Sequence, residues 1–443
     1  MTKEKQIAEN IMKYALRRGA DDCEIYWNRR FSASTQMRSG ALSDDTAADR
    51  IGYSVRLIKK GVPGFAYGVT MDEASMRRSV DDALVSCAFL ETDPFYHFTE
   101  GGKTYPQAPA LWQGETGFSQ IKAFLEEMTA AAKTDPRILR VERAAFGDSR
   151  GDVHILNSLG LDLEREYRYV SASATVVAAE GSEEYLGGDF RAVGRFDELD
   201  PVSIGQKAAE EGLDKLGASA IETEELPVLF RPEAVLDLLG IVLPSFLGDH
   251  VEKGMSRLKE MLGKIVASPK VSLFDDAMMA ESVLKIPFDD EGQPCGRHCL
   301  IDHGTAEQFL YDNRYGKKSG AESTGNGFCG SHKALPTIGL SSFYLEKGES
   351  DLASLIGEQK KALWVKDLMG LHTADAVSGD FSLGAVGRLI ENGEVTKSVR
   401  GVMIAGNLFD LLKDVEAVCD DFTVFGDVAA PSFLIKSLKI SGK

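Results

Sequence analysis

The sequence lacks the features that mark membrane and secreted proteins. No stretch comes close to the roughly 20 consecutive apolar residues that a membrane-spanning helix needs. Residues 1–19 are polar and charged, without the apolar segment of a secretory signal peptide. The six cysteines are scattered over 443 residues, and this usage favours reduced thiols over a disulfide framework. We therefore expect a cytoplasmic protein with no membrane segment.

Clusters of positive charge are missing as well. The chain carries 50 Lys and Arg against 68 Asp and Glu, which gives a formal net charge of -18. No run of basic residues is longer than a pair. Nucleic acids and acidic membrane surfaces attract clustered Lys and Arg, because these side chains bind phosphate and release its counterions. We therefore expect no direct nucleic-acid partner and no membrane partner.

What the chain does contain is typical of a globular protein with two domains. Hydrophobic residues make up 43% of it and charged residues 27%. Its length exceeds the roughly 250–300 residues that one hydrophobic core usually organises. Residues 218–225 are small, polar and acidic, as expected of a linker. We predict an N-terminal domain over residues 1–220 and a C-terminal domain over residues 221–443.

Hydrophobic periodicity and turn residues predict the α+β class, with largely antiparallel sheets and flanking helices in both domains. The first half is expected to contain a helix ending at Gly19, strands at 23–37 and 51–58, helices at 70–87 and 119–132, strands at 139–146, 153–158 and 167–178, and a helix at 203–216. The second half is expected to contain a strand at 227–230, a helix from Pro232 that ends or kinks at Pro244, a helix near 352–363, and strands at 286–288, 299–302, 395–399 and 402–405. Thr70 and Glu73 are expected to form the capping box of the second helix.

A Gly-x-Ser-x-Gly pattern at residues 147–151 resembles the turn that carries a hydrolase nucleophile. That turn needs a strand before it and a helix after it, whereas residues 152–157 are expected to form another strand. We interpret residues 147–151 as a polar hairpin turn. Ser149 and His154 are accordingly not assigned to catalysis.

Soft metal ligands gather in one short segment, at Cys295, His298, Cys299 and His303. Zinc prefers such nitrogen and sulfur ligands, but this spacing is not that of a usual zinc site. In a strand, His298 and Cys299 would point to opposite faces of the sheet. A metal site is therefore the less favoured interpretation, and the Asp249–Glu252 segment is expected to lie on a solvated surface near a helix end.

Ser323, Thr324, Gly325, Asn326 and Gly327 form a glycine-rich segment that could bind an extended chain. No Lys-Ser or Lys-Thr follows it as in a phosphate-binding loop, and no Gly-x-Gly-x-x-Gly opens a helix elsewhere. Loop glycines allow close approach of another backbone. A plain surface turn is the competing interpretation.

Seven motifs in the second half, taken in order, resemble the TldD/PmbA family. They are Leu243–Asp249, Lys253–Ser256, Pro287–Gly292, Ser323–Asn326, Gly379–Ser382, Glu391–Gly393 and Ile404–Asn407. The resemblance covers nearly the whole chain and is looser in the first half, where residues 52–68 and 157–160 carry it. This family is often labelled modulator of DNA gyrase. The resemblance implies two related branches that pair into a cytoplasmic metalloprotease acting on peptides and unfolded segments.

The TldD branch of that family carries the zinc motif His-Glu-x-x-x-His on the helix before the Gly-Asp pair. Counting back from Gly248, this sequence has Leu-Gly-Ile-Val-Leu-Pro at residues 239–244. None of the seven histidines is followed by Glu, so no other alignment restores the motif. The branch also has a cysteine ligand near its C-terminus, and residues 423–428 contain none, while Cys419 is expected to be buried. The sequence is therefore similar to the PmbA (TldE) branch, the subunit without metal.

The resemblance implies a non-catalytic partner subunit, with no metal or cofactor of its own and with zinc in a TldD-branch partner. The assembly would be a heterodimer or larger, with a homodimer when the partner is absent and peptides or unfolded proteins as substrate. Residues 323–327 are the candidate contact with substrate or partner. Two alternatives remain: a self-sufficient hydrolase that uses the Cys295–His303 segment with Glu252 or Asp302, and a regulator that binds gyrase or another protein without proteolysis.

Overall fold

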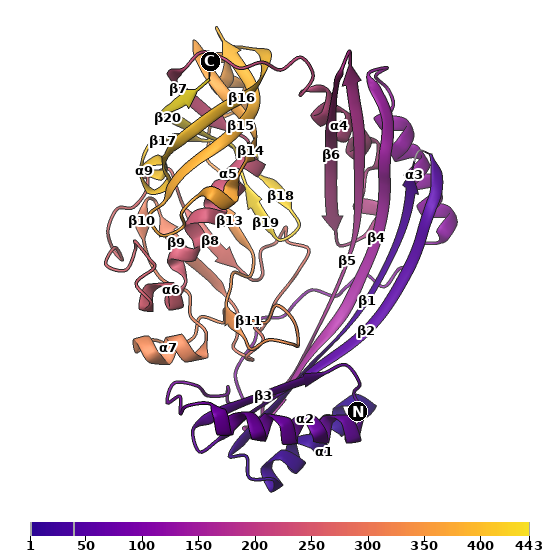
Figure 1. Ribbon diagram of the computed structural model, residues 1–443, viewed down its shortest axis with the longest axis vertical. Helices are drawn as coiled ribbons and strands as arrows, with labels where there is room; N and C mark the ends of the chain where they lie inside the picture. The colour runs from indigo at the N-terminus through magenta and orange to yellow at the C-terminus, as the bar shows by residue number, and fades with distance from the viewer. Residues whose placement is uncertain (1, 39, 443) are drawn as a thin grey trace.

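The computed structural model describes residues 2–38 and 40–442, which form two halves lying side by side (Figure 1). Both halves are α+β with largely antiparallel sheets, as predicted. In the described part of the chain, no helix combines the length and apolar character needed to cross a membrane.

The N-terminal half is built on one antiparallel sheet of six strands in the order β3-β2-β1-β4-β5-β6. The strands are β1 (Asp22–Arg38), β2 (Ala41–Lys59), β3 (Val62–Gly68), β4 (Ile138–Asn157), β5 (Asp162–Glu180) and β6 (Glu183–Val193). The four strands β1, β2, β4 and β5 have 17 to 20 residues each, and they curve along the whole height of this half (Figure 1).

The hairpin turn predicted at residues 147–151 is wrong, because β4 continues through them. Each of these residues pairs with β1 on one side and with β5 on the other, so the ladder bonds outweigh the local turn propensity. Ser149 and His154 are five positions apart on one strand and lie on opposite faces of the sheet. The ring of His154 stacks on that of Trp27, 4.4 Å away.

Two pairs of helices cover one face of this sheet. The pair α1 (Lys3–Arg17) and α2 (Glu73–Ser86) packs on one end, and the pair α3 (Phe118–Ala132) and α4 (Pro201–Leu213) packs on the other. The predicted capping box is wrong by two residues: the N-cap of α2 is Asp72, whose side chain accepts a hydrogen bond from the backbone N–H of Ser75 at 2.8 Å. Short 3-10 helices follow at η1 (Cys87–Phe89) and η2 (Phe196–Glu198).

The C-terminal half contains two further six-stranded sheets that share one hydrophobic core. The first has the order β16-β15-β14-β7-β20-β17, with β7 (Glu224–Phe230), β14 (Lys361–Met369), β15 (Asp380–Glu391), β16 (Glu394–Asn407), β17 (Val415–Val418) and β20 (Phe433–Ser441). The second has the order β10-β9-β8-β13-β19-β18, with β8 (Leu273–Asp276), β9 (Arg297–Asp302), β10 (Thr305–Ala306), β13 (Phe343–Leu345), β18 (Thr423–Phe425) and β19 (Val428–Ala430). A small pair, β11 (Gly327–Phe328) and β12 (Thr337–Ile338), lies apart from both sheets.

Helix α5 (Pro232–Val242) contacts strands of both C-terminal sheets. The remaining helices are short: η3 (Leu243–Phe246), α6 (Gly248–Glu252), α7 (Asn313–Ser319), α8 (Leu352–Gly357), η4 (Leu371–Thr373) and α9 (Leu408–Lys413). The helix predicted at 352–363 ends at Gly357, because Lys361 already begins β14, which pairs with β7 and β15. The helix α5 ends at Val242, and Pro244 is the second residue of η3, as expected of a proline that ends a helix.

A buried guanidinium joins the two halves. The side chain of Arg56 on β2 is 1% exposed and donates hydrogen bonds to Glu24 Oε1 at 3.1 Å and to the backbone oxygen of Asp290 at 2.7 Å. Arg165 on β5 forms a second bridge, with 2.6 Å between its Nη2 and Asp290 Oδ1. Two strands of the N-terminal sheet are thereby bound to one C-terminal loop.

Acidic groups outnumber basic ones in this buried region. Asp289 and Glu291 flank Asp290, and both are buried. Desolvation raises the pKa of Asp289 to about 7, and it raises the pKa of Glu291 well above the usual range, helped by the nearby charge of Asp289. The loop therefore favours a form in which part of its carboxyl groups keep a proton at neutral pH.

We expect Glu291→Gln to stabilise the protein at alkaline pH. Glu291 Oε2 accepts a hydrogen bond from the backbone N–H of Asn313 at 2.7 Å, and a glutamine keeps that acceptor without the charge. An acid whose pKa is raised in the folded state loses stability as the pH rises through that pKa. Urea unfolding should show the variant to be more stable than the wild type by about 1 kcal/mol or more near pH 8.5, with a smaller difference near pH 6.

Exposed Glu222 supplies the matched control. Glu222→Gln should leave the pH dependence of unfolding unchanged. If Glu291→Gln is less stable than the wild type at both pH values, the buried carboxyl group is ionised and the explanation is wrong.

Candidate functional site

Residues 239–244, which the resemblance places at the zinc motif of the TldD branch, lie on α5 and η3. Leu239 is 1% exposed and belongs to the core that the two C-terminal sheets share. Gly240 is exposed, with open space where a side chain would point. Pro244 is half-buried in η3. These three residues offer neither an imidazole nor a carboxylate, and Leu239 contributes packing instead.

The soft ligands at Cys295–His303 do not converge on one point. The Nε2 atom of His298 lies 2.7 Å from the backbone oxygen of Thr324, and Cys295 Sγ donates to the oxygen of Gly325 at 3.0 Å. Cys299 Sγ donates to the oxygen of Ile301 at 3.4 Å, while the exposed ring of His303 contacts Asp302. Over residues 2–38 and 40–442, no group of three or more His, Cys, Asp and Glu side chains is arranged to hold a metal ion.

Glu252 lies away from that segment, at the end of α6. Its carboxylate contacts Ser319 and Lys318 of α7. The residues that the hydrolase alternative needs are therefore not brought together, because Glu252, Asp302 and Cys295 serve three different local structures.

Cys295 and His298 instead support the glycine-rich loop at 323–327. Both bind backbone oxygens of that loop, at Thr324 and Gly325. Burial lowers the pKa of His298, because desolvation disfavours the imidazolium. A neutral ring with one N–H can donate to the oxygen of Thr324, so the two features that the sequence singled out form one structural unit.

Asn326 anchors the loop from inside. It is 1% exposed, and its Nδ2 donates to Asp275 Oδ2 at 2.7 Å and to the backbone oxygen of Gly339 at 2.9 Å. Asp275 is also buried, and desolvation raises its pKa to about 6 although the amide of Asn326 opposes the shift. The amide and the carboxyl group thus satisfy each other in the interior.

The glycines of the loop are required by close approaches. Gly325 has a φ of +75°, and a Cβ built on it would lie 2.3 Å from the oxygen of Pro294. A Cβ on Gly327 would lie 2.5 Å from Glu291 Oε2, and the backbone N–H of Gly327 donates to Asp289 Oδ2 at 2.8 Å. Residues 325–327 are buried, whereas Ser323 and Thr324 are half-buried. Contact of this loop with substrate or partner therefore depends on its first two residues and stays a prediction.

Sequence reasoning missed the buried carboxyl groups of Asp275 and of residues 289–291. The run Asp-Asp-Glu after Phe288 has the composition of a solvated turn. Its buried partners, Arg56 and Arg165, come from strands more than 100 residues away. For residues 289–291, the signal available was their position inside the family motif at 287–292, whereas Asp275 lies in none of these motifs.

An open groove lies where the two halves meet. It has a volume of 690 Å³ and is lined by residues 109–112, by the end of β6 and the two residues after it (191–195), and by residues 280–283 of the C-terminal half. A neighbouring hollow of 520 Å³ continues along residues 105–111 to Phe288. Among the described residues, strand β6 pairs only with β5, and its last three residues, 191–193, line this groove.

Three domain models of one family match the chain. They are described as PmbA/TldA metallopeptidase domain 1 (residues 23–87), central domain (residues 114–216) and C-terminal domain (residues 223–442). In this division the N-terminal half corresponds to two family domains.

Proteins of both branches are similar to this chain. The Haemophilus influenzae metalloprotease PmbA homolog is 29% identical over 379 residues, which cover 84% of this chain and 81% of that protein. The TldD homolog of the same organism is 24% identical over 93% of this chain and 88% of that protein.

A solved structure has the same fold over the full length. The crystal structure of TldE from Thermococcus kodakarensis aligns with a TM-score of 0.91 at 27% identity, covering 98% of this chain and 100% of that one. Together with the three domain models, this places the chain in the PmbA/TldD metallopeptidase family.

Proposed function

We propose that this chain is a non-catalytic partner subunit of a TldD-type zinc metalloprotease that cleaves peptides or unfolded proteins. The observation that carries the proposal is Leu239, an apolar residue buried in the core at the position of the first zinc ligand. A zinc peptidase needs nitrogen, oxygen or sulfur ligands that fix the metal, and a base that activates its water. Residues 239–244 supply neither.

The similarity to TldE supports the same role, since it extends over 98% of this chain and 100% of that one. The groove between the halves suits a subunit that guides substrate. It combines an unpaired strand edge with a volume of 690 Å³, and an exposed strand edge can bind an extended peptide through its main chain. Such recognition depends on few side chains of the peptide, as a protease for unfolded substrates requires.

The test is reconstitution. The chain is purified alone and together with a TldD-branch protein, and peptide hydrolysis and co-elution on a sizing column are measured for both. The proposal requires no hydrolysis by this chain alone, and a higher rate from the mixture than from the TldD-branch protein alone. Hydrolysis by this chain alone, or a mixture that never associates, contradicts it.

We predict that the isolated chain binds no stoichiometric zinc. The ligands that could replace the missing motif are separately bonded, with His298 on Thr324 and Cys295 on Gly325. Elemental analysis after purification without chelator should give the same background for the wild type and for the Cys295→Ala, His298→Ala double variant. One zinc per wild-type chain that the double variant loses would favour the self-sufficient hydrolase.

Installing the zinc motif should damage the fold and should not create a peptidase. Leu239→His places a polar ring in the core, which costs about 2–5 kcal/mol of stability. The full set Leu239→His, Gly240→Glu and Pro244→His also lacks a third ligand and the groups that orient it. Gly240→Glu alone is the control: the side chain enters open space on a helix, so unfolding should shift by less than about 1 kcal/mol. Zinc-dependent cleavage by the triple variant would show that the rest of a metal site is present.

Substitutions near the two ends of the loop at 323–327 distinguish a binding role of the loop from a structural one. Asn326→Ala removes one buried donor from the Asp275 carboxyl group, which keeps the backbone N–H of Ser341, and should cost about 1–3 kcal/mol of stability. Ser323→Ala removes a half-buried hydroxyl that donates to the oxygen of Tyr311 and accepts from the N–H of Gly325, and it should cost only about 1 kcal/mol and leave the chain folded. If Ser323 contacts substrate or partner, cleavage by the mixed complex should fall about fivefold in Ser323→Ala.

Gly325→Val extends this comparison, because its side chain collides with the oxygen of Pro294. We expect it to unfold the loop. Should Ser323→Ala cleave normally while the other two variants fail only by unfolding, the loop has a structural role alone.

A further inference from the structure

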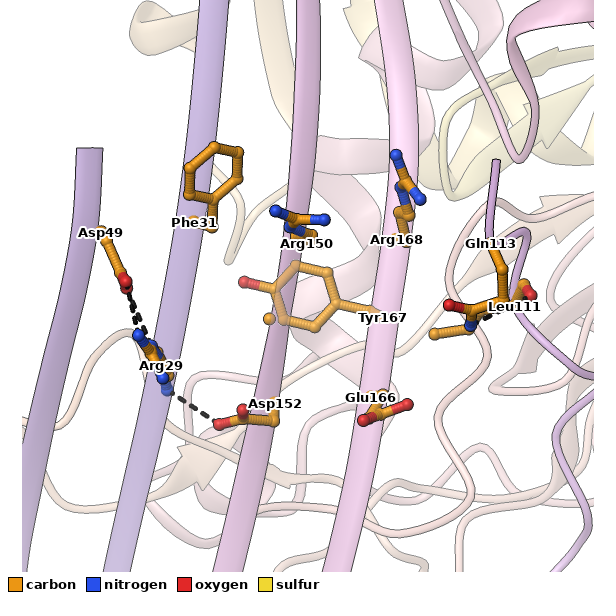
Figure 2. Close-up of a pocket in the computed structure, with 11 residues that line it drawn as sticks. Arg29, Phe31, Asp49, Leu111, Gln113, Arg150, Asp152, Glu166, Tyr167 and Arg168 are labelled. Carbon is orange, nitrogen blue, oxygen red and sulfur yellow. Dashed lines mark hydrogen bonds and ion pairs between the residues drawn. The ribbon is translucent and has the colours of Figure 1, made fainter. Parts of the chain in front are cut away.

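The helices α1–α4 leave part of the sheet face that they cover exposed. We call this face the outer face of the N-terminal sheet, and its uncovered part the window. The cluster under α1 and α2 ends at Trp27, and the cluster under α3 and α4 begins at Phe146 and Val170. Between them the same face presents polar residues from four neighbouring strands, and it holds a cavity of 300 Å³ (Figure 2). Leu111 and Gln113 close one side of it.

The register sorts these residues into two rows across the strands. One row contains Asp49, Phe31, Arg150 and Arg168, and the next contains Arg29, Asp152 and Glu166. Successive residues on one face of a strand lie about 7 Å apart, so the rows are separated by roughly that distance.

Two of the three arginines in the window are already paired. Arg29 lies against Asp49, with 2.9 Å and 2.6 Å between their paired atoms. Arg168 is held by Asp148 at 2.8 Å and by the backbone oxygen of Trp112 at 3.2 Å. Their charges are therefore largely satisfied.

Arg150 is different. Its guanidinium lies over the ring of Phe31, 4.5 Å from the centroid, and it makes no hydrogen bond or ion pair with the residues that the structure describes. The ring orients the cation without using its N–H groups. A planar guanidinium with free donors matches a carboxylate, which it can bind through two parallel hydrogen bonds.

The second row offers the opposite charge. Glu166 is exposed and, within residues 2–38 and 40–442, has no hydrogen bond or ion pair. Beside it, the Oδ2 atom of Asp152 accepts from the backbone N–H of Arg29 at 3.2 Å and lies 3.4 Å from His154 Nε2. The window thus has a free cation in one row and a free anion in the next.

We propose that this window binds the two charged ends of a short peptide, with its C-terminal carboxylate on Arg150 and its N-terminal ammonium on Glu166. The volume is at the lower end of the range for small-ligand sites, about 300–1,000 Å³, which suits a dipeptide. Phe31 and Leu111 supply apolar surface for its side chains. The inference goes beyond the proposed function, and because it needs neither partner nor proteolysis, each can fail without the other.

The probe is the dipeptide Ala-Leu, titrated into the isolated chain by calorimetry and by NMR. Three blocked forms accompany it: the C-terminal amide, the N-acetyl form and the form blocked at both ends. We expect each single block to weaken binding roughly tenfold, since each removes one charge-assisted contact. Absence of saturable Ala-Leu binding at millimolar concentration overturns the proposal.

Charge substitutions at Arg150 and Glu166 test which end of the dipeptide each residue binds. Arg150→Gln should abolish the preference for the free acid over the amide and keep the preference for the free amine. Glu166→Gln should do the reverse. If either variant discriminates as the wild type does, the corresponding end is assigned wrongly.

Matched controls lie on the same sheet. Arg30 is exposed on the opposite face of β1, and Glu184 is exposed on β6. Arg30→Gln and Glu184→Gln remove the same charges and should leave Ala-Leu binding within about twofold of the wild type. Equal weakening by these controls would mean that net charge, and not the window, attracts the peptide. Thermal unfolding of all four variants verifies that each is folded.

Discussion

The two halves of this protein depend on the buried guanidinium of Arg56. It binds Glu24 within the N-terminal sheet, the backbone of Asp290 in the C-terminal half, and Cys329 Sγ at 3.0 Å. Removing one member of such a buried ion pair typically costs about 3–5 kcal/mol, because the other charge stays in the interior without compensation. The loop at 323–327 belongs to the same network, since Gly327 binds Asp289 next to Asp290.

This network changes the meaning of the motifs that carry the family resemblance. In the sequence, residues 287–292 and 323–326 are two of the motifs that carry the family resemblance. In the fold they form an internal scaffold, in which the carboxyl groups accept backbone N–H groups and Asn326 supports Asp275. That scaffold joins β2 and β5 of the N-terminal half to residues 289–291 of the C-terminal half through Arg56 and Arg165.

The sequence predicted the fold class, most helices and the family. Its predictions failed at positions whose structure is determined by residues far away in the chain. Residues 147–151 have the composition of a turn, but they form a strand because they pair with β1 on one side and with β5 on the other. The acidic run at 289–291 could not be recognised as buried without Arg56 and Arg165, which lie far away in sequence. The absence of the zinc motif, by contrast, could be recognised from the sequence, because the motif consists of neighbouring residues. The structure adds only that Leu239 is part of the core.

The central pairing of the N-terminal sheet has a consequence for how the protein folds during synthesis. Strand β1 pairs with β4, and Glu24 lies opposite Asn157, 133 positions later in the chain. The hairpin of β1 and β2 forms from adjacent residues, but closing the long loop to β4 costs more chain entropy and comes later. Until the ribosome has released β4, the nascent chain exposes the inner edge of β1, and we expect chaperones to protect that edge during translation.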